Sequence, residues 1–190
     1  MIGIREFNKK IASLKNTKKM TKTMKMVSAS KFKRAFKAQS SALTYARELT
    51  GLMNRLSQFD SSASHPLMVK TKSVQNALVL LITSDKGLCG GFNNNLIRYV
   101  RGWMTANQSN YKAIDLSFCG KRGFTALRRQ VNVNKNYEDV TTNPKFSHAV
   151  QIGKDLSDAY VGKKYDEIYI AYNRFNNPMS QTPTIEKLVP

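Results

Sequence analysis

Residues 4–59 read IREFNKKIASLKNTKKMTKTMKMVSASKFKRAFKAQSSALTYARELTGLMNRLSQF, a stretch with no proline and a single glycine, Gly51. Apolar residues recur in it at steps of three and four, the spacing of one face of an α-helix. They are Ile4, Phe7, Ile11, Leu14, Ala35, Ala38, Ala42, Ala46, Leu49, Leu52, Met53 and Leu56. The pattern predicts one amphipathic helix with a coiled-coil-like seam, roughly 80 Å long at 1.5 Å per residue.

The same stretch is strongly basic. It contains fourteen Lys and Arg residues and only two acids, Glu6 and Glu48, so residues 4–59 carry +12 of the chain's net charge of +19. An isolated helix gains most of its stability by packing its apolar face, so the seam predicts a partner. No second helix of this length is predicted after residue 60. We therefore expect the partner to lie in another molecule or in a C-terminal segment outside these 190 residues, and the unpaired helix to fray or self-associate.

The seam weakens between Thr17 and Ser30, where Thr21 and Ser28 occupy positions that larger apolar residues would fill. Two interpretations remain open for this segment. The methionines at positions 20, 24 and 26 can make an adaptable core contact, since Met side chains fill irregular gaps. Alternatively, the small hydroxylated residues form a sliding or bearing surface.

Composition limits the class of protein. The chain has two cysteines, Cys89 and Cys119, too few for a disulfide scaffold and typical of a reducing compartment. It contains no run of about 18 apolar residues and no apolar signal segment after Met1, so we expect no membrane span and a cytosolic or already processed protein. A basic arm indicates a polyanionic or acidic partner.

Three regions are predicted: a coiled-coil helix over 1–59, a linker over 60–74 rich in Ser with one Pro, and a globular domain over 75–190. In the globular domain, strands are predicted at 77–83, 113–119, 131–133 and 167–172, with an edge strand at 183–189. Helices are predicted after Asn93, over 120–130 and over 146–161, and a polar loop over 132–145. The 146–161 helix places Phe146, Ala149, Val150, Gly153, Leu156 and Tyr160 on one side. Alternating strands and helices indicate an α/β, Rossmann-like and mostly parallel sheet with flanking helices.

The turn Ser84-Asp85-Lys86-Gly87-Leu88-Cys89-Gly90-Gly91-Phe92-Asn93 follows the first strand and precedes a helix that the Asn93–Asn95 run can cap. This order resembles phosphate-binding loops, but the glycine spacing matches neither dinucleotide nor P-loop fingerprints. The glycines are therefore interpreted as turn and packing residues. Cys89 could act as a nucleophile, yet the two histidines, His65 and His148, both fall in polar loops, and no general base is evident. We expect no catalytic residue, no metal site and no cofactor.

Nucleic-acid binding is the competing interpretation of the basic helix. It would make the protein a basic coiled-coil adaptor or a nucleic-acid-binding module with a degenerate Rossmann-like domain. The lysines are distributed around and along the helix, aromatic residues for base stacking are sparse, and no known nucleic-acid-binding module is recognisable. We therefore expect no nucleic-acid partner.

Two long motifs resemble the gamma subunit of F-type ATP synthases, the central rotor shaft. Residues 11–31, IASLKNTKKMTKTMKMVSASK, resemble the N-terminal helix of that family almost position by position. Residues 83–93, TSDKGLCGGFN, resemble the turn after the first strand of its globular domain, and residues 181–190 resemble its last strand. The motifs occur in the family's order and together span nearly the whole chain.

The resemblance implies an N-terminal helix paired with a C-terminal helix inside a ring of alternating alpha and beta subunits, with the Rossmann-like domain below. It implies a non-catalytic subunit whose other partners are the epsilon subunit and the membrane c-ring. The implied location is peripheral, on the cytoplasmic side of a bacterial inner membrane, or on the matrix side of the mitochondrial inner membrane. Rotation of the asymmetric shaft would drive the beta subunits through different affinities.

The family's beta subunits present an acidic loop to the shaft, and the resemblance places Met24 and Lys25 near it, together with the glycine-rich turn. The full set of expected interface residues is Lys18, Lys22, Met24, Lys25, Lys31, Lys33, Arg34, Lys86, Leu88 and Cys89. Exposed contacts of this kind contribute roughly 0 to 1 kcal/mol each, so they can be broken and remade at every turn.

Overall fold

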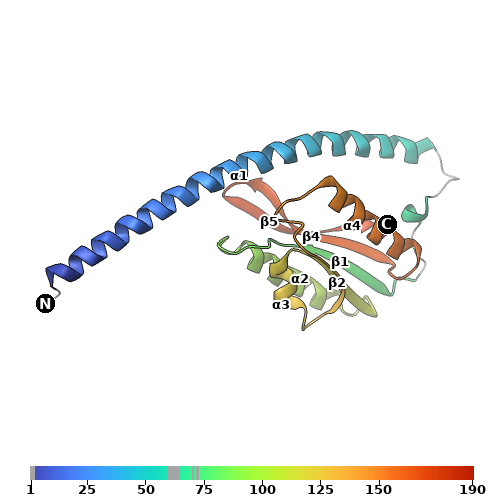
Figure 1. Cartoon of the computed structure of the whole chain (residues 1–190). Helices are drawn as coiled ribbons and strands as arrows, with labels where there is room; N and C mark the ends of the chain where they lie inside the picture. Colours follow the sequence, from blue (N-terminus) through green and yellow to red (C-terminus); the bar gives the residue numbers. More distant parts are fainter. Residues whose placement is uncertain (1–2, 60–64, 70, 72) are drawn as a thin grey trace. The chain divides into compact units, whose positions relative to one another are not determined.

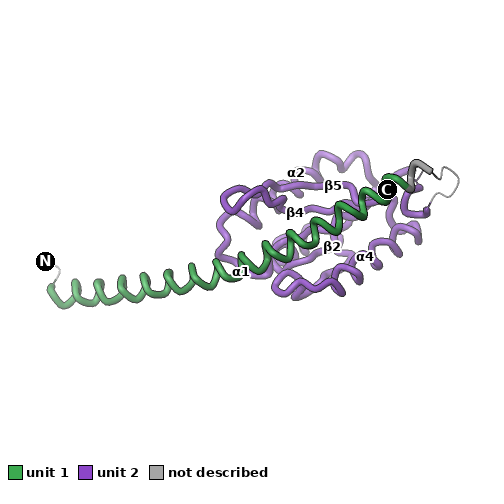
Figure 2. Tube along the Cα trace, turned by 90° about the horizontal axis from the view of Figure 1, so that it is seen from above, with its two compact units in different colours: residues 1–63 green, residues 64–190 purple. Residues whose placement is uncertain are grey.

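The computed structural model describes residues 3–59, 65–69, 71 and 73–190. The chain divides into two compact units, Met1–Ala63 and Ser64–Pro190, which Figure 2 shows in different colours. Of the linker predicted over 60–74, residues 60–64, 70 and 72 lie outside the described part. Its described part contains a short 3₁₀ helix, η1 (Pro66–Met68).

The first unit contains the helix α1 (Ile4–Phe59), with the bounds that the absence of proline and the apolar spacing predicted. No side chain described in it, from Ile4 to Arg55, is buried. Ile4 is 82% exposed and Leu14 63% exposed. A helix that buries none of its apolar face lacks the packing that stabilises helices in proteins.

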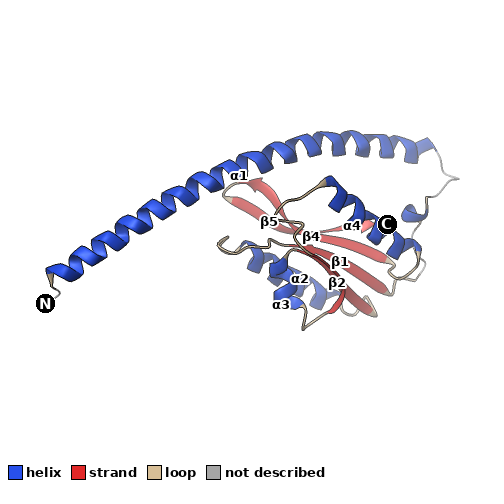
Figure 3. Cartoon of the chain, viewed as in Figure 1, coloured by secondary structure: helices blue, strands red, loops and turns tan. Residues whose placement is uncertain are grey.

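The second unit contains a five-stranded sheet in the order β3-β2-β1-β4-β5. Its strands are β1 (Asn76–Ile82), β2 (Ala113–Cys119), β3 (Asn132–Tyr137), β4 (Glu167–Asn177) and β5 (Ser180–Val189). The first four are mutually parallel, and β5 pairs antiparallel with β4 at the edge. The predicted mostly parallel α/β fold is therefore confirmed, with strands and helices shown in Figure 3.

Three helices cover the two faces of this sheet (Figure 1): α2 (Phe92–Asn107), α3 (Lys121–Leu127) and α4 (Phe146–Val161). Val79 and Leu81 of β1 pack with α2 and α3, while Leu78 and Leu80 pack with α4. Both faces of β1 are therefore buried, which explains why its sequence is a continuous apolar run. The position of α2 and α3 on one face and α4 on the other makes the sheet doubly wound.

The strand predictions were wrong at the polar edge. Residues 132–137 form the strand β3, whereas the sequence predicted a brief strand at 131–133 and a polar loop from residue 132. The sequence of β3, NVNKNY, lacks apolar alternation because Asn132, Val133 and Lys135 are exposed at the edge of the sheet. The side-chain pattern of these residues therefore does not identify a strand, and β3 is defined by its pairing with β2.

The helix α4 has the predicted bounds, but its apolar side is only partly buried. Leu156 and Tyr160 belong to the core, whereas Phe146 and Val150 are 79% and 53% exposed. The placement of both histidines in polar loops was also wrong, because His148 lies in α4. No helix in the described part of the chain is long and apolar enough to cross a membrane.

Candidate protein-interaction surfaces

The glycine-rich turn after β1 is fixed by one buried side chain. Asn93 is 6% exposed, and its Oδ1 accepts a hydrogen bond from the backbone N–H of Ser84 at 3.0 Å. Its Nδ2 donates to Ser84 Oγ at 2.8 Å and to Cys89 Sγ at 3.1 Å. Asn93 was predicted as a helix cap, but the N-cap of α2 is Gly91, which has no side chain to make a capping hydrogen bond. Asn93 instead ties together the beginning and the end of the turn.

The three expected interface residues of the turn are all exposed. Leu88 is 95% exposed and has a φ of 62°, a conformation that is uncommon for a residue with a side chain. Gly90 follows with a φ of 55°, which glycine adopts without steric cost. Lys86 and Cys89 are exposed on either side of Leu88. The turn therefore presents an apolar tip in a strained backbone conformation, a feature associated with functional sites.

Asp85 anchors the base of the turn to two other segments. Its carboxylate accepts hydrogen bonds from the Lys121 N–H at 3.0 Å and from the hydroxyls of Thr141 and Thr142 at 2.6 and 2.8 Å. Burial by itself raises the pKa of Asp85, but these hydrogen bonds outweigh burial and lower the pKa below its ordinary value of 3.8.

Replacing Asp85 with Asn should make the stability of the globular unit less dependent on pH in acid. Because the folded-state pKa is lowered, the carboxylate stabilises the fold above the unfolded-state pKa, and that contribution is lost as the pH falls through the folded-state value. We expect Asp85→Asn to cost about 1 kcal/mol at pH 7 and less towards pH 3. Urea unfolding at a series of pH values measures both effects.

The matched control for this prediction is Asp158→Asn, since Asp158 is an exposed acid on α4. The control should leave the unfolding free energy nearly unchanged at pH 7. A pH profile of Asp85→Asn that parallels the wild type would contradict the role assigned to this carboxylate.

The seven expected interface residues of α1 are all exposed on the described helix. Lys18, Lys22 and Lys25 follow steps of four and three and therefore share one face, while Met24 and Lys31 share a neighbouring one. Between them, the hydroxyl of Thr21 donates to the Thr17 carbonyl at 2.8 Å. The hydroxyl is satisfied within the helix, so a partner can pack against this segment without leaving a buried polar group unpaired.

The α1 residues and the turn residues belong to different units, so each group forms a candidate surface of its own. The roles of Asp85 and Asn93 in holding the turn were not predicted from the sequence. A polar residue directly after a buried strand is a signal that could have identified Asp85, because the ends of parallel strands gather such side chains at one edge of a sheet.

The two cysteines differ sharply in environment. Cys89 is exposed in the turn, whereas Cys119 is buried at the end of β2. Burial, followed by the charge of Asp85, raises the pKa of Cys119 to about 11. Cys119 is therefore inert at neutral pH, since the thiolate is the reactive form.

A protein-family model described as ATP synthase matches residues 3–190. The chain is 36% identical over 190 residues to the ATP synthase gamma chain of Geobacter metallireducens, a match that covers all of this chain and 66% of that protein. It is 36% identical over 191 residues to the ATP synthase gamma chain of Methylobacillus flagellatus, again with coverage of 100% and 66%. The chain thus spans 66% of the length of these curated relatives.

Solved structures agree with the sequence comparison. A chain of the Tetrahymena thermophila mitochondrial ATP synthase, from a structure of its central stalk and c-ring, is similar with a TM-score of 0.64 and 29% identity, covering 90% of this chain and 72% of that one. A rotor chain of the Euglena gracilis mitochondrial enzyme shares the fold, with a TM-score of 0.59 and coverage of 98% and 63%. The matches extend from the basic helix through the last strand of the sheet, and the chain therefore belongs to the gamma-chain family of ATP synthases.

Proposed function

We propose that this chain is a central-stalk rotor subunit of an F-type ATP synthase that couples rotation to conformational cycling of the catalytic beta subunits. The observation that carries the proposal is the 36% identity to ATP synthase gamma chains over the whole of this chain. The helix α1 has 56 residues, buries no described side chain and belongs to a stretch with a charge of +12. These properties suit a shaft that turns inside a ring of subunits with acidic inner surfaces.

In this proposal the subunit is non-catalytic and acts through its contacts with other subunits of the complex. Its partners are the alpha and beta subunits around α1, the epsilon subunit and the membrane c-ring. The proposed location is peripheral, on the cytoplasmic side of a bacterial inner membrane. The bacterial gamma chains among the relatives support this location over the mitochondrial matrix.

Exposed cations on α1 provide the coupling contacts in this proposal. Each contact with an acidic loop contributes roughly 0 to 1 kcal/mol, because exposed ion pairs gain little over solvation. A shaft held by many weak contacts can turn, since no single contact dominates the barrier to rotation. The turn residues Lys86, Leu88 and Cys89 would add a second contact region, with the apolar tip of Leu88 at its centre.

Co-purification tests the assignment. Affinity-tagged full chain, expressed with alpha, beta and epsilon subunits of a bacterial relative, should retain these subunits through size exclusion at 150 mM salt. Recovery of nucleic acid in place of the subunits would support the competing binding-module interpretation and contradict the rotor assignment.

Reversing one charge, Lys25→Glu, should disturb coupling more than assembly. We expect the affinity for the alpha and beta subunits to change by about 1 kcal/mol or less, since one exposed contact is altered. We also expect the ATP yield per proton to fall in reconstituted vesicles, because the lost contact recurs at each beta subunit in every turn. Measuring both quantities on the same preparation separates them.

The matched control is Lys37→Glu, which makes the same change on the same helix outside the expected interface set. It should leave the ATP yield per proton at the wild-type value. An unchanged yield for Lys25→Glu would argue against a coupling role for this residue.

A further inference from the structure

The stretch from Lys86 to Val131, which spans the turn, α2, β2 and α3, has almost no acidic residues. It contains eight cationic side chains and one acid, Asp115, whereas the rest of the unit from Ser64 has nine Lys and Arg and eight acids. The eight cations are Lys86, Arg98, Arg101, Lys112, Lys121, Arg122, Arg128 and Arg129. Nearly all of the positive excess of the globular unit is therefore concentrated in one stretch.

The single acid of this stretch lies on the opposite face of the sheet. Leu116 and Phe118 of β2 pack in the core below α2 and α3, so the alternation of the strand turns Asp115 towards α4. The hydroxyl of Tyr165, which belongs to the core on the α4 side, donates to Asp115 Oδ2 at 2.7 Å. Asp115 therefore does not balance the charge on the side of α2 and α3.

None of the eight cations has an ion-pair partner within the described residues. The ion pairs found there join Lys135 to Asp155, Arg174 to Glu186 and Lys187 to Glu167. All eight cations are exposed. Arg101 Nη2 reaches only the carbonyl oxygen of Ala126, at 3.4 Å. These side chains are therefore available to an external anion.

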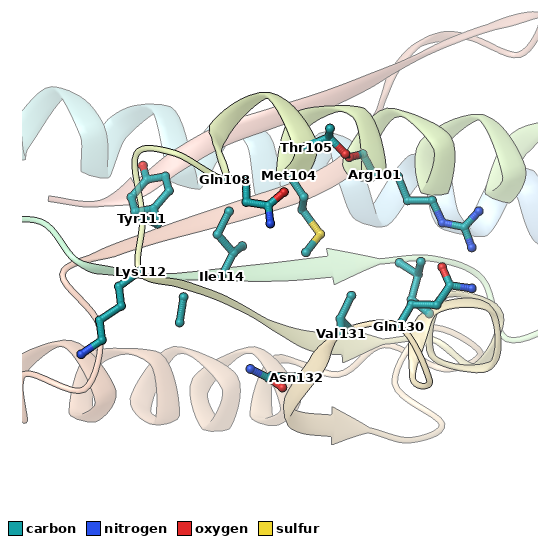
Figure 4. Close-up of a pocket in the computed structure, with 12 residues that line it drawn as sticks. Arg101, Met104, Thr105, Gln108, Tyr111, Lys112, Ile114, Gln130, Val131 and Asn132 are labelled. Carbon is teal, nitrogen blue, oxygen red and sulfur yellow. The ribbon is translucent and has the colours of Figure 1, made fainter.

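A cavity of about 520 Å³ opens on the same side of the sheet, between the C-terminal half of α2, the end of α3 and the starts of β2 and β3. Met104, Ile114, Leu127 and Val131 line it with apolar surface, and none of its lining residues is acidic. Figure 4 shows Arg101 and Lys112 at opposite ends of the cavity. An apolar floor between two cations fits a ligand that alternates apolar and acidic groups.

We propose that this surface, the eight cations together with the cavity, docks an acidic segment of a partner protein. An apolar side chain of that segment occupies the cavity, and flanking carboxylates meet Arg101 and Lys112. We refer to it as the α2–α3 face. The proposal depends on charge and cavity alone and does not require the rotor assignment.

The distribution of charge favours a protein segment over the other anionic ligands. Two of the cations lie in α2 and the others in the turn, directly before β2 and at the two ends of α3. Only Arg101 and Lys112 line the cavity, so a small carboxylate in it would meet only two of the eight. Nucleic acid would match the charge, but base stacking needs exposed aromatic faces, and Tyr111 is the one aromatic side chain in the lining. A peptide with alternating acidic and apolar side chains uses both the cations and the apolar floor.

The test is a titration of ¹⁵N-labelled full chain with the capped peptide acetyl-Glu-Leu-Glu-Glu-Leu-Glu-amide at 50 mM salt. We expect the largest amide shifts in residues 101–114 and 127–132. The double variant Arg101→Glu/Lys112→Glu should weaken peptide binding at these amides by about tenfold or more, since two favourable charge contacts become repulsive. The double variant Lys145→Glu/Lys154→Glu, which makes the same change in charge at two exposed lysines on the α4 side, should weaken it by less than about twofold.

Four outcomes would overturn the proposal. The first is equal weakening by the two double variants, which would indicate attraction to net charge alone. The second is a set of shifts confined to residues 5–55, which would assign binding to α1. The third is equal binding of a peptide in which Gly replaces both Leu residues, which would show that the cavity is not used. An oligonucleotide of twelve thymidines should shift these amides less than the peptide does, and a larger shift would assign the face to phosphate binding.

Discussion

Gly120→Ala should strongly destabilise the globular unit. Gly120 has a φ of 111°, which side chains rarely adopt, and a methyl group at this position would overlap the carbonyl oxygen of Thr83. Thr83 cannot move away, because it is 2% exposed and its hydroxyl both donates to the Gly120 carbonyl at 3.1 Å and accepts from the Gly123 N–H at 2.9 Å. We expect a loss of about 4 kcal/mol or more, out of the roughly 5–15 kcal/mol that stabilises a domain.

Urea unfolding followed by the fluorescence of Trp103 measures this loss. Trp103 is the chain's one tryptophan and packs on Tyr169 with ring centroids 4.8 Å apart, so its signal reports on the globular unit. The control is Gly102→Ala, since Gly102 lies in α2 with open space at the Cβ position. The control should stabilise the unit by up to about 1 kcal/mol. A urea unfolding midpoint for Gly120→Ala equal to that of the wild type would contradict the close packing of Gly120 against Thr83.

Trypsin should cut the first unit far faster than the second. The fourteen Lys and Arg residues of residues 4–59 are all exposed in α1, which has no apolar packing to hold its turns closed. The strands of the second unit are held by a two-sided core. We expect fragments of 5–55 to be released at least about tenfold sooner than fragments of 75–190, because cleavage follows the population of locally opened states.

Mass spectrometry of a timed digest gives the two rates on one sample. The same digest in 4 M urea serves as the control, since both units should then be cut at similar rates. Resistance of residues 5–55 equal to that of the globular unit in a monomeric sample would contradict the expectation that α1 depends on an external partner. Protection of α1 on addition of alpha and beta subunits would support the proposed shaft role.

The sequence predicted the elements that are set by local chemistry. The bounds of α1 follow from the absence of proline together with a regular apolar spacing, and β1 follows from its continuous apolar run. The strand β3 could not be predicted, because a polar edge strand is defined by its pairing with β2 and not by its own pattern. The extension of β4 from Tyr172 to Asn177 has the same cause, since those residues pair with the polar strand β5.

The candidate surfaces were predictable only in part. Motif resemblance identified the turn, but its support by Asp85 depends on Thr141 and Thr142, more than fifty residues away. The side of the sheet on which Asp115 lies likewise depends on which residues of β2 point into each of the two cores. The expected interface residues of α1 stay predictions, since their partners belong to other chains in the proposed complex.

Photo-crosslinking from position 25 tests the central claim most directly. Lys25 is replaced by p-benzoylphenylalanine in the full chain, which is then assembled with alpha, beta and epsilon subunits and irradiated. The rotor proposal predicts a crosslinked product that contains the beta subunit and whose yield falls when the acidic loop of that subunit is neutralised. Crosslinks to nucleic acid or to a second copy of this chain, with none to the alpha or beta subunits, would contradict it.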